Sequence, residues 1–294
     1  MKLGFRTRST VAVAGLAACL MLAVTAAPSF AQQGAGRGGR GTGFIQSSNP
    51  RVQNRTYKFA DTNEDMPYCV FVSSKVSKDK KNPLIISLHG LGIGPGFMCQ
   101  GKAIDLAEEG GYILAAPMGY SPGGWYGSPV MQGRGGRGGA PAGPPPPENL
   151  AELSEKDVLN VLAMMRKEFN IDERRTYLMG HSMGGAGAYF LGSKHAKEWA
   201  ALAPIAPAAF LMNTNRAAIL QGIKDTNVPM LVTQGDADEA VPVTNTRMWV
   251  ETMKELKMNY EYKEYPGVTH GPIIEAAIPD IFAFFGKYSK SATR

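Results

Sequence analysis

The chain of 294 residues has little excess charge of either sign. Its formal net charge is +6, and residues 1–31 carry three basic residues and no acidic one, so the rest of the chain carries +3. A nucleic-acid-binding protein usually clusters many more Lys and Arg side chains on one face. Two Gly/Arg runs, 37–42 and 134–139, resemble RNA-binding segments but are also typical of flexible Gly-rich loops. We therefore expect no nucleic-acid partner.

Cysteine is also scarce, with three residues in the whole chain. Outside the N-terminal segment only Cys69 and Cys99 are left. Their spacing is no metal motif, and two thiols without a nearby histidine do not make a zinc site. The sequence thus predicts neither a metal site nor a cofactor. In an oxidising compartment the two cysteines can form a disulfide; the alternative is two separate buried thiols.

Long apolar runs are rare, and the clearest one lies near the N-terminus. Residues 11–24 carry no charge and follow a basic start, while Ser29 and Ala31 are small residues at the −3 and −1 positions of a cleavage site. This is the pattern of a secretory signal peptide, and it is too short to be a membrane span. We predict that residues 1–31 are removed and that the protein is secreted or periplasmic. An alternative is a lipid anchor at Cys19, although the residues that follow it stay apolar.

Strand and helix patterns begin after residue 50. Residues 32–50 are rich in Gly, Gln, Ser and Arg and predict a disordered leader. The expected strands are 56–60, 68–73, 84–89, 112–116, 175–179, 200–205, 229–233 and 259–265. The expected helices are 99–109, 154–169, 185–195, 244–256 and 272–286. A Gly/Pro-rich insertion at 121–149 interrupts this alternation. We assign 51–290 to one catalytic domain.

Alternating strands and helices predict an α/β fold. Several strands are short and continuously apolar, which is typical of a mostly parallel sheet with helices on both faces. The first two strands follow each other without a helix, so we expect them to form an antiparallel edge. In the helix at 154–169, we expect Ser154 to cap the start and Asp157 to occupy its first turn.

The candidate nucleophile is Ser182, in the stretch Gly180-His181-Ser182-Met183-Gly184. An expected strand runs directly into this stretch and an expected helix follows it. In that context G-x-S-x-G is a nucleophile elbow, whose sharp turn leaves no room for side chains at the two glycine positions. The N-terminus of the following helix then directs its dipole at an anion that forms beside the hydroxyl.

A serine needs a base to be a good nucleophile, and histidine is scarce, with four in the chain. In this type of fold the base follows the serine in the sequence, which leaves His195 and His270. His195 is flanked by lysines in a helix and is typical of a solvated face. His270 lies in a Gly-flanked loop between the last expected strand and the last expected helix. We therefore predict His270 as the base.

Two aspartates compete for the third position, Asp236 and Asp238, with Glu239 beside them. All follow the expected strand at 229–233. The acid must leave the strand end and reach the far nitrogen of the imidazole. Asp238 is better placed for this contact, whereas Asp236 is closer to the strand and is expected to cap its own loop. We predict Asp238.

An oxyanion hole needs two backbone N–H donors beside the nucleophile. One is expected from Met183, directly after the serine, and the other from the loop after the third strand. That loop contains His89-Gly90-Leu91. We predict the N–H group of Leu91 as the second donor, with Gly90 as the alternative, and we expect His89 to brace the loop.

Taken in order, LIISLHGLG, GHSMGG, GDADEAVP and GVTHG resemble the α/β-hydrolase superfamily. The stretch 155–185 is similar to secreted esterases of the feruloyl esterase and polyhydroxybutyrate depolymerase type, and to prolyl oligopeptidase-like catalytic domains. The resemblance covers roughly residues 55–288. It implies a serine hydrolase without cofactor, whereas its motifs do not specify the substrate.

We therefore expect a serine hydrolase that cleaves small or polymeric carboxylic esters through an acyl-enzyme. Alternatives are a peptidase-like hydrolase, a cutinase-like or depolymerase-like polyester hydrolase, an acyltransferase, and a binding protein on an inactive scaffold. Trp125 and Tyr126, in the insertion after the fourth expected strand, are candidate substrate contacts. The competing interpretation is that these two aromatic side chains pack the insertion onto the protein. The oligomeric state is left open.

Overall fold

The computed structural model describes residues 1, 45–130, 146–212 and 215–291. The chain divides into two units, 1–34 and 35–294, and of the first only Met1 is described. The predicted signal peptide, most of the predicted leader and part of the insertion therefore lie outside the described residues. Everything below concerns the second unit.

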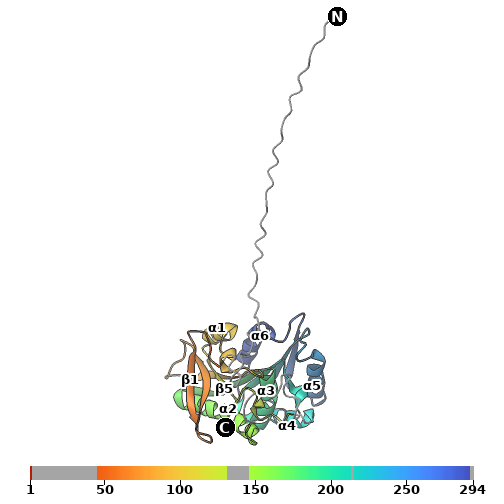
Figure 1. Ribbon diagram of the computed structural model, residues 1–294. Coiled ribbons are helices and arrows are strands. Elements are labelled where there is room, and N and C mark those ends of the chain that lie inside the picture. The colour runs from red at the N-terminus through yellow and green to blue at the C-terminus, as the bar shows by residue number, and fades with distance from the viewer. Residues whose placement is uncertain (2–44, 131–145, 213–214, 292–294) are drawn as a thin grey trace. The chain divides into compact units, whose positions relative to one another are not determined.

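One eight-stranded sheet forms the centre of this unit, in the order β1-β2-β4-β3-β5-β6-β7-β8 (Figure 1). The strands are β1 Gln53–Phe59, β2 Glu64–Val72, β3 Asn82–Leu88, β4 Ile113–Pro117, β5 Ile171–His181, β6 Ala201–Ile205, β7 Met230–Gly235 and β8 Tyr260–Tyr265. β2 pairs antiparallel with both β1 and β4, and every other pair is parallel. The predicted α/β sheet with an antiparallel edge is confirmed.

Six α-helices and four short 3₁₀ helices connect the strands in the described part of the chain. The α-helices are α1 Gly101–Gly110, α2 Leu150–Glu168, α3 Met183–Lys194, α4 Arg216–Thr226, α5 Val243–Glu255 and α6 Ile273–Lys287. The 3₁₀ helices are η1 Pro95–Met98, η2 Trp125–Gly127, η3 Ala196–Glu198 and η4 Ala209–Leu211. The sequence patterns predicted all of the α-helices except α4. Among the described residues, no helix combines the length and the apolar character that a membrane crossing needs.

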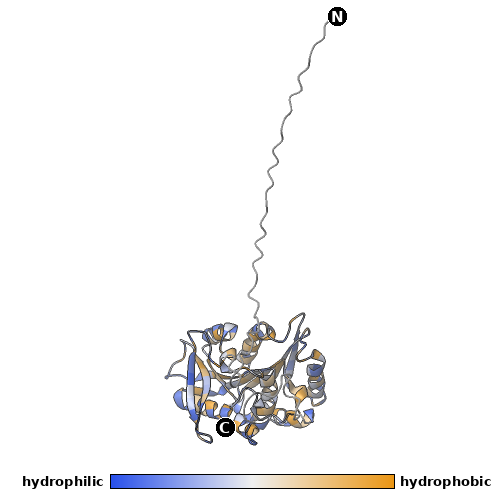
Figure 2. Cartoon of the chain, in the orientation of Figure 1, coloured by the Kyte–Doolittle hydropathy of each residue, from blue (hydrophilic) through white to orange (hydrophobic). Residues whose placement is uncertain are grey.

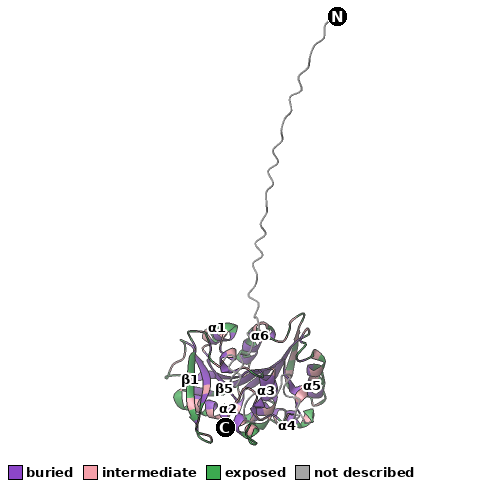
Figure 3. Ribbon diagram, viewed as in Figure 1, coloured by how far each residue is buried: buried purple, intermediate pink, exposed green. Residues whose placement is uncertain are grey.

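Two apolar layers cover the two faces of the sheet. Successive side chains of a strand point to opposite faces, so Leu84 and Ile86 of β3 contribute to one layer and Ile85 to the other. The first layer is completed by α2 to α5, and the second by α1 and α6. Figures 2 and 3 show the resulting apolar, buried strands between helices whose outer faces are polar and exposed. This double coverage is why the central strands are continuously apolar.

The start of α2 differs from the prediction. The helix begins at Leu150, so Ser154 and Asp157 lie inside it and do not cap it. Both side chains are fully buried. The Ser154 hydroxyl donates to the Gly119 carbonyl oxygen at 2.5 Å, and Asp157 accepts the Gly119 N–H at 2.7 Å. The prediction was wrong because the two side chains bind the segment after β4, which is distant in the sequence.

Cys69 and Cys99 form a disulfide. It joins β2 to the segment between η1 and α1, and both cysteines are fully buried. Of the two alternatives that the sequence left open, the structure therefore contains the bridge.

Candidate active site

Ser182 lies on the turn between β5 and α3. Its backbone dihedral angles are φ 58° and ψ −113°, outside the regions that L-residues usually occupy. A Cβ atom at Gly180 would lie 2.2 Å from the Gly184 carbonyl oxygen, and one at Gly184 would lie 2.2 Å from that of Leu88. No side chain fits either position, so the two glycines are required for the turn. A strained serine held in this way is typical of a functional site.

Hydrogen bonds from both sides hold the strained turn. The Ser182 N–H donates to the Ile205 carbonyl oxygen at 2.9 Å, and the Ser182 carbonyl oxygen accepts the N–H groups of Ala186 and Ala208. Because α3 begins at Met183, the free N–H groups of its first turn lie next to the serine. The positive end of the helix dipole therefore lies at the serine as well.

His270 and Asp238 come together from the ends of two neighbouring strands, β8 and β7. The His270 Nδ1 atom lies 2.7 Å from Oδ2 of Asp238. The Asp238 side chain is fully buried, and its oxygens also accept the N–H groups of Ala240 and Val241 and the Gln234 amide. Burial raises the pKa of Asp238, but these hydrogen bonds outweigh it, so the pKa lies below its usual value. The carboxylate therefore stays ionised beside the imidazole.

Asp236 holds the same loop from a different position. Its Oδ1 atom accepts the Gly267 N–H at 2.6 Å, in the loop that leads to His270. We expected Asp236 to cap its own loop, whereas it binds the neighbouring one. No hydrogen bond between Asp236 and His270 is present in the described part of the chain.

The loop of His270 lies against the turn of Ser182. The Nε2–H group of His181, the residue before the serine, donates to the His270 carbonyl oxygen at 2.9 Å, and the centres of the two rings are 4.5 Å apart. Among the described residues, no hydrogen bond joins the Ser182 hydroxyl to the His270 ring. Such bonds are often long without substrate and shorten when it binds. The structure thus brings all three predicted residues to one edge of the sheet.

His181 has a role that the sequence did not predict. It is buried, and its Nδ1 atom has no hydrogen-bond partner in the described residues. Burial, followed by the proximity of His270, lowers its pKa from 6.5 to about 3. The ring is therefore neutral, which is the state in which a single Nε2–H group faces the His270 carbonyl.

This neutral histidine predicts a loss of stability in mild acid. An unfolded chain binds a proton at His181 as the pH falls below 6.5, whereas the folded chain does not until about pH 3. The free energy of unfolding should therefore fall by up to about 1.4 kcal/mol per pH unit in this window. Urea unfolding at pH 7 and pH 5 measures the loss, and the loss should be smaller in His181→Gln. An equal loss in both proteins would contradict the assignment.

The loop after β3 passes directly beside the serine. A Cβ atom at Gly90 would lie 3.5 Å from the Cβ atom of Ser182. The side chain of the next residue, Leu91, is 41% exposed. Met183, the other predicted donor, begins α3. Gly90 and Met183 therefore lie in backbone next to the serine, Leu91 follows Gly90, and the oxyanion hole stays a prediction.

His89 braces this loop. The ring is fully buried, which lowers its pKa. Nδ1 lies 2.8 Å from the Gly90 carbonyl oxygen, and Nε2 lies 2.8 Å from that of Met118. Whichever nitrogen carries the hydrogen, the ring bonds a carbonyl of this loop or of the segment after β4. These contacts agree with the bracing role that we expected.

The two candidate substrate contacts in η2 are buried. Tyr126 has no exposed surface, and its hydroxyl donates to the His89 carbonyl oxygen at 3.1 Å. Trp125 is 5% exposed and belongs to the same apolar layer as α3. For Tyr126 this burial favours the packing interpretation, because no face of its ring is left for a substrate. A substrate contact of Trp125 stays a prediction.

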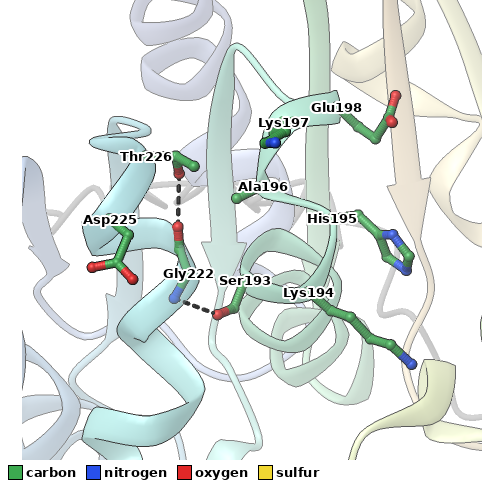
Figure 4. Close-up of a pocket in the computed structure, with 9 residues that line it drawn as sticks. All are labelled: Ser193, Lys194, His195, Ala196, Lys197, Glu198, Gly222, Asp225 and Thr226. Atoms are coloured by element: carbon green, nitrogen blue, oxygen red, sulfur yellow. Dashed lines mark hydrogen bonds between the residues drawn. The ribbon is translucent and has the colours of Figure 1, made fainter.

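A separate groove of about 410 Å³ lies at the other end of α3 (Figure 4). Its walls are residues 193–198 and Gly222, Asp225 and Thr226 of α4. Ser193 is eleven residues beyond Ser182 along the chain, or about 16 Å at the rise of a helix. His195, at this end, binds Glu155 at 2.7 Å. The groove is therefore not part of the site at Ser182.

The described residues contain no group of three or more His, Cys, Asp or Glu side chains placed to hold a metal ion. A partly exposed His270 ring, a buried carboxylate behind it and a serine on a strained turn suit nucleophilic attack followed by proton transfer.

A family model and several known proteins match this chain. The Esterase family model matches residues 60–283. A bifunctional acetylxylan esterase/xylanase of Neocallimastix patriciarum is 26% identical over 191 residues, which are 64% of this chain and 25% of that protein. The chain thus spans about a quarter of the length of this curated relative.

Two solved structures share the fold. A ferulic acid esterase of Anaeromyces mucronatus is 18% identical, with a TM-score of 0.61 over 83% of this chain and 94% of that one. An S-formylglutathione hydrolase of Agrobacterium tumefaciens is 16% identical, with a TM-score of 0.63 over 80% of this chain and 94% of that one. At these identities the likeness concerns the fold alone.

Proposed function

The chain belongs to the Esterase family, and we propose that it is a secreted serine hydrolase that cleaves carboxylic esters with Ser182, His270 and Asp238. One observation carries the proposal. Ser182 lies on a strained strand-to-helix turn, and the loop packed against that turn holds a histidine that is hydrogen-bonded to a buried aspartate. The whole set lies at the carboxyl edge of the parallel strands, where open α/β sheets bind ligands.

The reaction follows from the position of each group. The Ser182 hydroxyl attacks the ester carbonyl carbon while Nε2 of His270 takes its proton. Nε2 then gives that proton to the leaving alcohol, and an acyl-enzyme remains on the Ser182 oxygen. Water, deprotonated by His270, releases the acid. Asp238 accepts the Nδ1–H group throughout, so it keeps Nε2 free as a base and stabilises the imidazolium.

The N–H groups of Met183 and Leu91 are the proposed donors to the negative oxygen of the tetrahedral intermediate. Met183 is the first residue of α3, and the Gly90 backbone, which Leu91 follows, lies beside the serine. Removing one such donor typically lowers kcat by about 10²- to 10³-fold.

For the substrate, we propose an acyl group carried on a larger alcohol, as in an acetyl or feruloyl ester of a polysaccharide. The acetylxylan esterase and the ferulic acid esterase among the similar proteins support this class. The proposed export, with cleavage after Ala31, is compatible with a polymeric substrate outside the cell. N-terminal sequencing of the exported protein checks the cleavage, since a lipoprotein would begin at Cys19.

A panel of chromogenic esters and amides tests the proposed class. The panel contains acetyl, feruloyl and longer acyl esters. Aminoacyl anilides with leaving groups of the same size serve as the comparison. We expect turnover of acetyl or feruloyl esters and little of the anilides. Preferred turnover of the anilides would favour the peptidase-like alternative, and transfer of the acyl group to an added alcohol in place of water would favour an acyltransferase.

Replacing Trp125 tests whether this side chain of the insertion packs in the core or contacts the substrate. Because the side chain is 5% exposed and packs in the core, Trp125→Ala should destabilise the protein by about 3–5 kcal/mol. We expect a lower Tm and a similar relative loss of turnover for every ester. An unchanged Tm, together with a higher KM for bulky esters only, would support the substrate contact instead.

A further inference from the structure

We propose that the hydroxyl group of Tyr126 is a positioning group for the oxyanion hole, because it fixes the backbone of His89-Gly90-Leu91. The proposal rests on the proposed ester hydrolysis. It assigns to a fully buried side chain of the insertion a function that acts through the backbone and not through contact with substrate.

The hydrogen bond from Tyr126 to the backbone of His89 is the first observation that supports this role. The Tyr126 hydroxyl donates to the His89 carbonyl oxygen at 3.1 Å, in a fully buried environment. Burial raises the pKa of Tyr126 well above its usual value, so the hydroxyl keeps its hydrogen. A ring held only for its packing would need no hydroxyl group, and here the hydroxyl bonds the backbone of the loop beside the nucleophile.

Because the peptide group is planar, a hydrogen bond to a carbonyl oxygen of this loop also orients the N–H group of the next residue. In a planar trans peptide the carbonyl oxygen and the N–H of the next residue point in opposite directions. Holding the His89 oxygen therefore aims the Gly90 N–H. The Gly90 oxygen lies 2.8 Å from Nδ1 of His89, and a bond there aims the Leu91 N–H in the same way. These two N–H groups, of Gly90 and Leu91, are the candidate donors that were predicted from the sequence.

The loop that is held in this way lies at the reacting centre. A Cβ atom at Gly90 would lie 3.5 Å from that of Ser182 and 3.3 Å from Nδ1 of His181. A small rotation of either peptide would redirect a donor away from the developing charge, because hydrogen bonds weaken steeply as their angle departs from linearity.

Helix α2 holds Tyr126 in place. The Tyr126 N–H donates to the Ser154 hydroxyl at 3.1 Å, and that hydroxyl donates to Gly119. Asp157 accepts the N–H groups of Gly119 and Tyr120 at 2.7 and 3.1 Å, and the Tyr57 hydroxyl at 2.5 Å. These bonds give a reason for two polar side chains inside a helix and in the core.

The backbone that they hold is strained. Tyr120, Trp125 and Tyr126 all have positive φ values, of 61°, 55° and 55°. Left-handed conformations of large residues persist only where the surroundings fix them, and they cluster at functional sites. The strain, the buried polar side chains and the bond to His89 thus have one explanation, which is the positioning of the oxyanion loop.

Tyr126→Phe removes the hydroxyl and keeps the ring. One net hydrogen bond corresponds to about a 3- to 10-fold effect, so kcat per active site should fall by that factor while KM changes little. Affinity for a boronic acid, which forms a tetrahedral adduct on the serine, should fall in parallel. Titration with a fluorophosphonate counts the folded active sites and removes any effect of partial unfolding.

Tyr189→Phe is the matched control. Tyr189 is also fully buried, and its hydroxyl has no partner in the described residues, while its ring stacks on Trp249 at 4.9 Å. The substitution deletes the same atom from the same layer of the core. We expect unchanged kcat and boronic acid affinity, with a Tm that is unchanged or higher because an unsatisfied polar group is removed.

Two results overturn the inference: a Tyr126→Phe protein with wild-type kcat per active site and wild-type boronic acid affinity, or equal losses in the Tyr126 and Tyr189 variants. Failure of the proposed function looks different. In that case Ser182→Ala keeps its activity, whereas in the two results above Ser182→Ala is inactive.

Discussion

Replacing Ser182 by alanine should lower ester turnover by about 10⁵- to 10⁶-fold, the scale seen when a serine hydrolase loses its nucleophile. The variant removes a single oxygen atom. Alanine keeps the Cβ atom that the serine has, so the backbone strain at φ 58° is the same in both proteins. The hydrogen bonds that hold the turn all come from the backbone and also stay.

The turnover of Ser182→Ala can be compared with that of the wild type only if the variant is folded. Circular dichroism and a Tm measurement establish this. Residual turnover above the uncatalysed rate is expected, because the oxyanion donors and the binding surface are still present. Turnover near the wild-type level by a folded alanine variant would show that the reaction uses another nucleophile.

Asp238→Asn should lower kcat by about 10⁴-fold. The surroundings of Asp238 fix how the amide would sit. One oxygen accepts the N–H groups of Ala240 and Val241, so the asparagine oxygen takes that place. The NH₂ group then faces Nδ1 of His270 and donates to it. The imidazole must carry its hydrogen on Nε2, which is the tautomer that cannot accept a proton from the serine.

Asp236→Asn is the matched control for this carboxylate. Asp236 accepts one N–H group, that of Gly267, which an asparagine oxygen can also accept. We expect kcat to change by less than about tenfold, since one exposed hydrogen bond is modified and not lost. If the Asp236 variant loses more activity than the Asp238 variant, the acid has been assigned to the wrong residue.

The sequence predicted the sheet and the elbow well because their signals are local. Short strand-like runs, several of them continuously apolar, predicted all eight strands, and the two glycines around Ser182 predicted a turn without room for Cβ atoms. The missing helix between the first two strands correctly predicted the antiparallel edge. In each case neighbours in the sequence set the structure.

The parts that were missed depend on contacts between distant residues. Ser154 and Asp157 have the spacing of a helix cap, but the helix begins four residues earlier and buries both against the segment after β4. Helix α4 was also missed, and it buries three apolar side chains, Ile219, Leu220 and Ile223. The bond from His181 to the His270 backbone joins residues 89 positions apart, and no local pattern indicates it.

The most direct test of the central claim is to trap the acyl-enzyme and locate it by mass spectrometry. The protein is mixed with a slowly hydrolysed ester or a fluorophosphonate, quenched in acid and digested. The account predicts one stoichiometric adduct on the Ser182 hydroxyl, absent from Ser182→Ala and formed far more slowly in His270→Ala. Hydrolysis of esters with no adduct at Ser182, or with the adduct on another residue, would contradict it.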